Sequence, residues 1–347
     1  MKYKKLSEQV LVVVGASSGI GLTTAKMAAK EGARVVLASR DEESLRRAVD
    51  EIQAEGGQAI YVVADVANRD ELETVANRAV EEYGGFDTWV NNAGVSIYGR
   101  ILDIPTDDAH RLFETNYWGV VNGSLVAVPR LLERGGVLIN TGSVVSDRAI
   151  PLQGHYSASK HAVKAFTDAL RVELEEEDAP VAVVLIKPAA IDTPFPEHAK
   201  NYMEAEPTLP PPVYAPEEVA RTILACAEKP RREMTVGGGG TMLGMMGKLT
   251  PRLGDKYMEA TQFSGQKLDR PADPDRPDSL WEPNLGSGRE HGDYPGHVMQ
   301  SSLYTRAALN PGIALIVLSM LGLTTALATK YRSANRSDWS GSTGWDL

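Results

Sequence analysis

Three side chains in the middle of the sequence have types and spacing suited to proton transfer. Tyr156 and Lys160 lie four positions apart in GHYSASKHAV, and Ser143 lies thirteen residues before Tyr156. A free tyrosine titrates near ~10, so a nearby ammonium group is needed to make its proton transferable at neutral pH. A helix would place Lys160 one turn beyond Tyr156, but this spacing is also ordinary on helix surfaces. The pair alone therefore does not establish a catalytic site.

A second signal lies near the N-terminus, where an apolar run is followed by a glycine-rich turn and a helical pattern. The run Val10–Val14 precedes GASSGIG, which contains Gly15, Gly19 and Gly21. Gly15 and Gly19 would let the backbone turn tightly and approach a pyrophosphate, and Gly21 would let the helix pack close to the strand. The helix N-terminus would offer free N–H groups to the phosphates. The sequence therefore predicts a dinucleotide site, although its glycine spacing differs from the commoner G-x-G-x-x-G pattern.

With these motifs in order, the sequence from about Leu6 to about Gly240 resembles the short-chain dehydrogenase/reductase family. The landmarks are GASSGIG, Asp65-Val66, Asn91-Asn92-Ala93-Gly94, Asn116, Ser143, the Tyr156 to Lys160 block, and Pro188 with Thr193. Two positions depart from the family pattern. Val14 stands where a threonine is usual before the first glycine, and Ala189 stands where a glycine usually follows the proline. Both bear on cofactor geometry rather than on the proton-transfer groups.

The resemblance implies an NAD(P)(H)-dependent oxidoreductase that transfers hydride between a nicotinamide and a carbonyl or secondary alcohol. Tyr156 would be the acid/base, and Lys160 would supply charge and hold the nicotinamide ribose. Ser143 would bind the substrate oxygen, and Asn116 would position a water; alternatively, Asn116 only bonds backbone. No metal site is expected. The implied cofactor-binding residues are Gly15, Ser17, Ser18, Gly19, Ile20, Gly21, Ser39, Arg40, Asp65, Val66, Asn92, Ala93, Gly94, Tyr156, Lys160, Pro188, Ile191 and Thr193.

The end of the second expected strand bears on the choice of cofactor. An acidic side chain there would bind the ribose hydroxyls of NAD, whereas an arginine can pair with a 2′-phosphate. The residues present are Ser39 and Arg40, so the resemblance favours NADP(H) over NAD(H). The alternative is that Arg40 is a solvated arginine at a helix start. Two other functions stay open: an NAD(H)-dependent alcohol dehydrogenase, and a catalytically silent module that senses NADP.

Short apolar strands alternate with amphipathic helices along most of the chain, which predicts a parallel sheet. The expected fold is α/β, a doubly wound Rossmann fold with three α/β/α layers, followed by a helical and extended tail. Ligands should bind at the carboxyl ends of the strands, where the motifs lie. The expected strands are 10–14, 34–38, 59–63, 88–91, 136–140, 181–187 and 234–236, with helices such as 42–55 and 69–83 between them.

Composition narrows the class of protein. The net charge of −10 and the absence of a visible stripe of Lys and Arg argue against a nucleic-acid partner. The single cysteine, Cys226, cannot form an internal disulfide, which fits a reducing compartment. The apolar run after MKYKK is short and already serves as a strand, so no export signal is expected. The predicted location is cytoplasmic.

The 347 residues exceed one such domain by about a hundred, and the surplus is C-terminal. Residues 1–240 are expected to form the dehydrogenase/reductase domain, 241–265 a helical extension, 266–305 a Pro/Gly-rich linker, 306–330 an apolar helix and 331–347 a polar tail. The uncharged stretch 307–329 is long enough to cross a membrane. It could span the cytoplasmic membrane, lie on it or on another subunit, or be buried in this domain, and attachment to the membrane is the favoured interpretation.

The substrate is expected to be a hydrophobic ketone or secondary alcohol. A long Pro-rich segment, 189–216, is interpreted as a lid, with Phe195, Tyr202, Met203 and Leu209 as possible contacts. Val144, Val145, Ile150 and Leu152 add apolar character near Ser143, although each could equally pack in the core. The resemblance also implies a homodimer or homotetramer paired through helices around 107–133 and 156–177.

Overall fold

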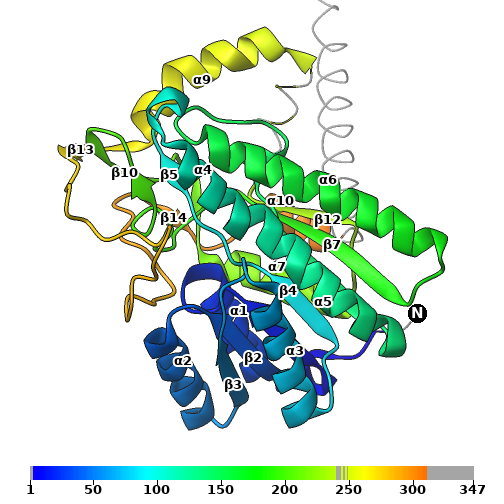
Figure 1. Ribbon diagram of the computed structural model, residues 1–347. Coiled ribbons are helices and arrows are strands. Elements are labelled where there is room, and N and C mark those ends of the chain that lie inside the picture. Colours follow the sequence, from blue (N-terminus) through cyan, green and yellow to red (C-terminus); the bar gives the residue numbers. More distant parts are fainter. Residues whose placement is uncertain (1–2, 240–243, 245–246, 248, 311–347) are drawn as a thin grey trace, which may run out of the picture. The chain divides into compact units, whose positions relative to one another are not determined.

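The computed structural model describes residues 3–239, 244, 247 and 249–310 (Figure 1). Its main strands are β1 (Val10–Val14), β2 (Arg34–Ser39), β3 (Gln58–Val63), β4 (Thr88–Asn91), β6 (Gly136–Thr141), β7 (Val181–Pro188) and β12 (Glu233–Val236). Its helices are α1 (Gly19–Lys30), α2 (Glu42–Ala54), α3 (Arg69–Tyr83), α4 (Thr106–Phe113), α5 (Gly119–Arg134), α6 (Gly154–Glu176), α7 (Pro216–Glu228), α9 (Pro251–Gly265) and α10 (Leu303–Leu309).

The main strands form one parallel sheet in the order β12-β7-β6-β4-β1-β2-β3. The chain starts at β1, moves outward to β3, and then returns across β1 to build the other half from β4. This arrangement confirms the expected doubly wound α/β fold, and the strand bounds differ from the expected ones by a single residue at most. The point where the winding direction reverses lies between β1 and β4, and ligands bind there in sheets of this kind.

The core consists of two apolar layers, one on each face of the sheet. Alternate residues of β1 point to opposite faces, as the period of a strand requires. Val10, Val12 and Val14 pack with α3, α5 and part of α6. Leu11 and Val13 pack with α1, α2 and Leu224 of α7. Helices therefore cover the sheet on both faces (Figure 1).

The helix expected around 107–133 is divided in the structure. A π-helical segment, Glu114–Trp118, joins α4 to α5. π-helical turns interrupt α-helices frequently at functional sites. Asn116, one of the expected catalytic residues, lies in this segment and is fully buried. The expected pairing of subunits through these helices stays a prediction.

Short strands connect the lid segment to the C-terminal part of the chain. β10 (Ala205–Pro207) pairs antiparallel with β13 (Lys267–Pro271), and β11 (Val213–Tyr214) lies between β8 (Ala190–Ile191) and β14 (Val298–Met299). β5 (Ile97–Tyr98) pairs with β9 (Lys200–Asn201). The lid is therefore attached to the body of the protein by backbone hydrogen bonds.

The C-terminal segments differ from the expected arrangement. Residues 1–305 form one compact unit, so the stretch 266–305, expected as a linker, belongs to the same unit as the sheet. The reason is a dense set of polar contacts that the composition of this stretch does not reveal. Residues 306–347 form a second unit. Most of the apolar stretch 307–329 lies outside the described residues; among the described ones, no helix is both long and apolar enough for a membrane span.

Candidate active site

A cavity of about 410 Å³ lies at the carboxyl ends of β1, β2, β4, β6 and β7. It brings together nearly all of the side chains singled out in the sequence. Every expected catalytic or cofactor-binding residue lines it except Gly21 and Asn116, which lie directly behind its wall. The glycine-rich turn and the Tyr156 block, about 140 residues apart in the sequence, thus face the same cavity.

The glycine-rich turn between β1 and α1 has almost no space for side chains. Gly15 has φ of +83°, and a Cβ there would lie 2.5 Å from Cα of Ala93. A Cβ at Gly21 would lie 2.0 Å from the Gly15 carbonyl oxygen. The loops after β1 and β4 therefore touch through their backbones beside the N-terminus of α1, where residues 17–20 line the cavity and the Gly19 N–H donates to the Arg289 carbonyl. This is the cradle that a pyrophosphate requires.

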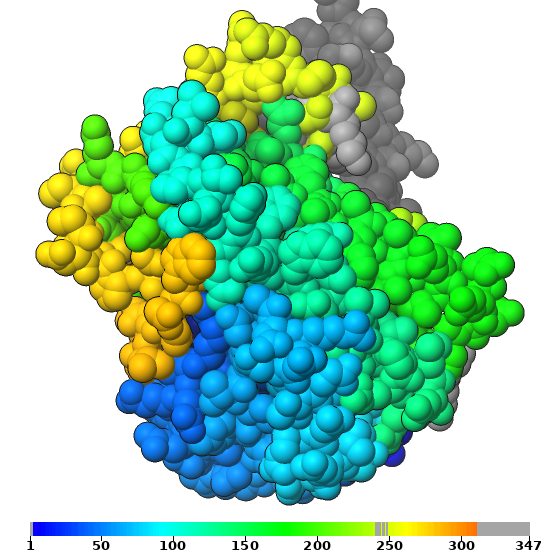
Figure 2. Space-filling view, viewed as in Figure 1, coloured from blue at the N-terminus to red at the C-terminus, as the bar shows by residue number. Residues whose placement is uncertain are grey.

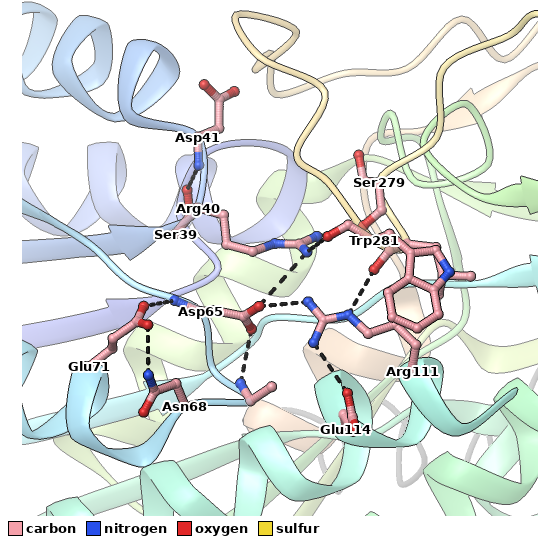
Figure 3. A network of polar contacts seen from close by, with 12 residues as sticks. Ser39, Arg40, Asp41, Asp65, Asn68, Glu71, Arg111, Glu114, Ser279 and Trp281 are labelled. Carbon is pink, nitrogen blue, oxygen red and sulfur yellow. Dashed lines mark hydrogen bonds and ion pairs between the residues drawn. The ribbon is translucent and has the colours of Figure 1, made fainter. Parts of the chain in front are cut away.

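The polar side chains near the end of β2 form hydrogen bonds and ion pairs with one another and with nearby carbonyls (Figure 3). Asp65 accepts hydrogen bonds from Nη2 of Arg111 at 2.6 Å and from the Ala67 N–H, and it lies 4.0 Å from Arg40. Burial alone would raise the pKa of the Asp65 carboxyl, but these donors outweigh it and hold the pKa below its ordinary value. Arg40 donates to the carbonyl oxygens of Ser279 at 2.5 Å and Trp281 at 2.8 Å. Arg40 is therefore not the freely solvated side chain of the alternative reading.

Tyr156 and Ser143 lie next to each other in the cavity. Burial raises the pKa of Tyr156 to about 12, and a hydrogen bond with Ser143 opposes this shift. The Tyr156 ring packs against Phe195, with the two ring centroids 5.5 Å apart. Ser143 also accepts from the Val145 N–H at the start of a short 3-10 turn, which fixes its backbone beside β6. The phenol is therefore protonated at neutral pH and can act as a donor.

Lys160 follows Tyr156 by one turn of α6, as expected, but it acts on the tyrosine less directly than expected. Its Nζ lies 5.8 Å from the Tyr156 ring centroid and donates to the Thr141 carbonyl at 2.9 Å. Burial lowers the pKa of Lys160 to about 8. The expected lowering of the tyrosine pKa is absent because desolvation dominates for both groups. The two side chains are nevertheless within reach of one ligand.

Asn116 makes the backbone contacts that were kept as its alternative role. Its Oδ1 accepts from the Val95 N–H at 2.8 Å, and its Nδ2 donates to the Val95 carbonyl at 2.9 Å and to Ser159 at 3.1 Å. Its Oδ1 and Nζ of Lys160 both lie about 3.5 Å from the point where a Cβ of Gly94 would stand. Asn116 therefore ties the loop after β4 to α6 and lies close to Lys160.

The residues present fit a polar dinucleotide. Among the described residues, four buried hydroxyls that line the cavity, those of Ser96, Tyr98, Thr115 and Thr141, have no hydrogen-bond partner. A buried polar group without a partner is costly and is normally satisfied by a ligand or water. Together with the backbone cradle at Gly15 and Gly21, these hydroxyls indicate a cavity built for a ligand with many acceptors.

The other end of the cavity is apolar. Val144, Val145, Ile150, Phe195 and Leu209 line it next to Ser143 and Tyr156. The remaining candidates for substrate contact do not line the cavity. Leu152 and Met203 pack in a core cluster, and the Tyr202 hydroxyl donates to Asp108.

Several lining residues were not found from the sequence. Tyr98 and Gln153 face the catalytic end, and Ser279, Pro283, Asn284, Ser287 and Gly288 line the dinucleotide end. Gln153 lies just before α6, and its closeness to Tyr156 in the sequence could have identified it as a residue of the site. The group from 279 to 288 carries no motif, and its composition indicates only a loop.

Comparison with protein families gives a match over residues 9–203 to the model described as short chain dehydrogenase. An uncharacterized oxidoreductase, YxnA, of Bacillus subtilis is 42% identical over 333 residues, which cover 95% of this chain and 93% of that protein. Dehydrogenase/reductase SDR family member 7B of Xenopus tropicalis is 32% identical over 76% of this chain and 88% of its own length. Most of the C-terminal surplus is thus shared with the Bacillus protein.

Solved structures are similar in fold and in sequence. A short chain dehydrogenase/reductase from Burkholderia phymatum in complex with NAD has a TM-score of 0.63 and 27% identity, covering 79% of this chain and 99% of that one. An alcohol dehydrogenase from Thermococcus sibiricus complexed with 5-hydroxy-NADP has a TM-score of 0.57 and 27% identity, covering 66% of this chain and 95% of that one.

The buried lysine predicts a dependence of stability on pH. Because the pKa of Lys160 falls from its ordinary 10.5 to about 8 on folding, the unfolded chain holds this proton between those pH values and the folded chain does not. The free energy of unfolding of the wild type relative to Lys160→Met should therefore rise as the pH increases from about 8 to about 10.5. Urea unfolding across this range measures it, with the exposed Lys229→Met as control. A constant difference between wild type and Lys160→Met would contradict the burial of a charged lysine.

Proposed function

Because this chain belongs to the short-chain dehydrogenase family, we propose that it is an oxidoreductase that exchanges hydride between NADP(H) and a hydrophobic ketone or secondary alcohol. The observation that carries the proposal is the single cavity that Ser143, Tyr156 and Lys160 share with the glycine-rich turn. A sensor of NADP would need the turn but not the proton-transfer set. The enzyme is therefore favoured over a catalytically silent module.

Ser143, Tyr156 and Lys160 each have a separate role in the proposed reaction. Ser143 and Tyr156 both line the cavity next to its apolar end, so both hydroxyls can donate to one substrate oxygen. A nicotinamide cofactor bound in the cavity would supply or accept the hydride. In reduction, Tyr156 gives its proton to the oxygen. Lys160, whose pKa is about 8, lies 5.8 Å from the Tyr156 ring centroid, so its proposed role is to bind the nicotinamide ribose and to add positive charge to the site, and Tyr156 recovers its proton from solvent.

Selection of NADP(H) is proposed to rest on Arg40. A guanidinium has five N–H donors, and the contacts with Ser279 and Trp281 use two of them. The remaining donors stay available for a 2′-phosphate at the end of β2, beside Ser39. Both side chains line the cavity. One solved relative was determined with NAD and another with an NADP derivative, so the proposed preference rests on Ser39 and Arg40 of this chain.

The proton donor is tested by Tyr156→Phe, which removes the hydroxyl and keeps the ring. The turnover number for NADPH oxidation with a ketone substrate should fall by about 100-fold or more, because general acid catalysis contributes on that scale. The dissociation constant for NADPH, measured by fluorescence titration, should change little. Tyr117→Phe, on the neighbouring helix, is the matched control. Activity of Tyr156→Phe near that of the wild type would rule out Tyr156 as the acid.

Cofactor selection is tested by Arg40→Ala. The ratio of the dissociation constants for NADH and NADPH should fall by about 10- to 100-fold, because a hydrogen bond between charged groups contributes ~1.5–3 kcal/mol. Loss of the Ser279 and Trp281 contacts would weaken both cofactors alike, and so it would not change the ratio. Trp281→Ala keeps Arg40 and removes the indole that donates to Asp108, so it controls for a general loosening of this segment. An unchanged ratio in Arg40→Ala would exclude the phosphate role.

The substrate class is tested with a homologous series of methyl ketones. If the side chains of Val144, Val145, Ile150 and Leu209 bind the alkyl chain, kcat/KM should rise about fourfold with each added methylene until the cavity is full. Steady-state assays with NADPH measure the slope, and Ile150→Ser should reduce it. Activity confined to small polar ketones would reject the hydrophobic substrate.

A further inference from the structure

A segment far beyond the family-matched residues closes the dinucleotide end of the cavity. Residues 278–293, which we call the strap, lie between β13 and β14 and form neither a helix nor a strand. The first half of the strap is residues 278–283, and the second half begins at Asn284. Five residues of the strap line the cavity opposite Ser39, Arg40 and the glycine-rich turn: Ser279, Pro283, Asn284, Ser287 and Gly288. Figure 2 shows the orange spheres of this part of the chain lying against the blue N-terminal part.

The first half of the strap is held by one fully buried apolar side chain and by hydrogen bonds from two arginines (Figure 3). Three consecutive carbonyls, at 279, 280 and 281, each accept a hydrogen bond from Arg40 or Arg111. The Leu280 side chain is fully buried in an apolar cluster beside α4. The Trp281 ring lies 6.0 Å from the Arg111 guanidinium, and its Nε1 donates to Asp108 at 2.8 Å. This half is anchored by both packing and charge.

The second half lies directly on the expected pyrophosphate cradle. The Gly19 N–H donates to the Arg289 carbonyl at 2.8 Å, and the Gly288 N–H donates to Ser44 at 3.0 Å. A Cβ at Gly288 would lie 2.2 Å from the Ser17 carbonyl oxygen, and a Cβ at Gly292 would lie 2.5 Å from that of Thr193. Glycine at these two positions lets the strap backbone touch both sides of the groove.

The second half has no buried side chain to match Leu280 and is held by polar contacts alone. These include Gly286 with Asp41, Ser287 with His198, and His291 with Asp192 and Glu217. Arg47 donates to the Gly286 and Gly288 carbonyls at 3.1 and 3.2 Å, both at exposed sites. Lys26 pairs with Glu290 at 2.8 Å, and both side chains are more than a quarter exposed. Exposed polar contacts of this kind contribute little individually. The half that covers the phosphates is therefore the half that can open at the lower free-energy cost.

We infer that the strap is the outer wall of the dinucleotide site and that its second half must open for a nicotinamide dinucleotide to enter or leave. The inference rests on the proposed function in that it requires such a cofactor to bind. It assigns to residues 284–292 the control of cofactor exchange. The first half serves as the fixed end, and Arg40 connects it to the expected 2′-phosphate position.

A gate has a kinetic signature that loss of a binding contact does not share. Weakening a gate accelerates both entry and release of the ligand, whereas losing a contact accelerates release alone. Gly288→Ala inserts a methyl group between the strap and Ser17, and Arg47→Ala removes two strap contacts without touching the cavity. Arg46→Ala is the matched control, since this neighbouring exposed arginine is on the same helix and has no described strap contact.

Stopped-flow fluorescence with the full chain gives both rate constants, using NADPH binding and its displacement by excess NADP⁺, with NADH in parallel. We expect association and dissociation of NADPH to accelerate together by about tenfold in Gly288→Ala and Arg47→Ala, with Arg46→Ala within twofold of wild type. Circular dichroism checks that the variants are folded. If Gly288→Ala does not fold, the rate constants of Arg47→Ala alone test the inference.

Two results would overturn the gate while leaving the proposed function intact: unchanged rate constants in Arg47→Ala, or faster dissociation with unchanged association. If the wild type binds neither NADPH nor NADH, the proposed function fails and the gate fails with it.

Discussion

The close approach of two backbone loops at the centre of the sheet is the constraint on which the site depends. The turn after β1 and the loop after β4 meet where Gly15 contacts Ala93, with no space for a side chain. This contact sets the position of α1 and of the chain that leads through Val95 to Asn116. Because Asn116 also bonds Ser159 on α6, the same contact is linked to the helix that carries Tyr156 and Lys160. Phosphate cradle and proton donor are therefore positioned by one continuous set of contacts.

Desolvation is the second common factor in the site. It raises the pKa of Tyr156 and lowers that of Lys160, so each group is pushed toward its neutral form. With a pKa of about 8, Lys160 still carries its proton at neutral pH and loses it just above, whereas Tyr156 stays neutral. The charge that the chemistry needs is thus available close to neutral pH instead of being permanently present. Polar residues at the other end, such as Asp65 with Arg111, keep their charge because each has a partner.

Sequence patterns predicted the parts of the molecule that depend on side-chain type. The buried strands β1 and β4, the glycine-rich turn and the spacing of Tyr156 and Lys160 are all visible as residue patterns, and the structure places them as expected. The break at Glu114–Trp118 was missed because no pattern of residue types distinguishes a π-helical turn from the α-helix on either side of it. The contacts of Arg40 were missed for a different reason. Its partners are the carbonyls of Ser279 and Trp281, about 240 positions away, and a main-chain oxygen leaves no trace in the sequence.

The way the strap is held has a consequence for how such segments change during evolution. Six of its carbonyl oxygens, at 279, 280, 281, 286, 288 and 289, accept hydrogen bonds from the rest of the chain. Every residue type carries that oxygen, so many strap side chains can vary while the attachment persists. Selection would then act on the donors, which lie in the dehydrogenase domain, and on the few glycines that must stay small. A related protein can therefore keep this cover with a C-terminal sequence that shows almost no recognisable pattern.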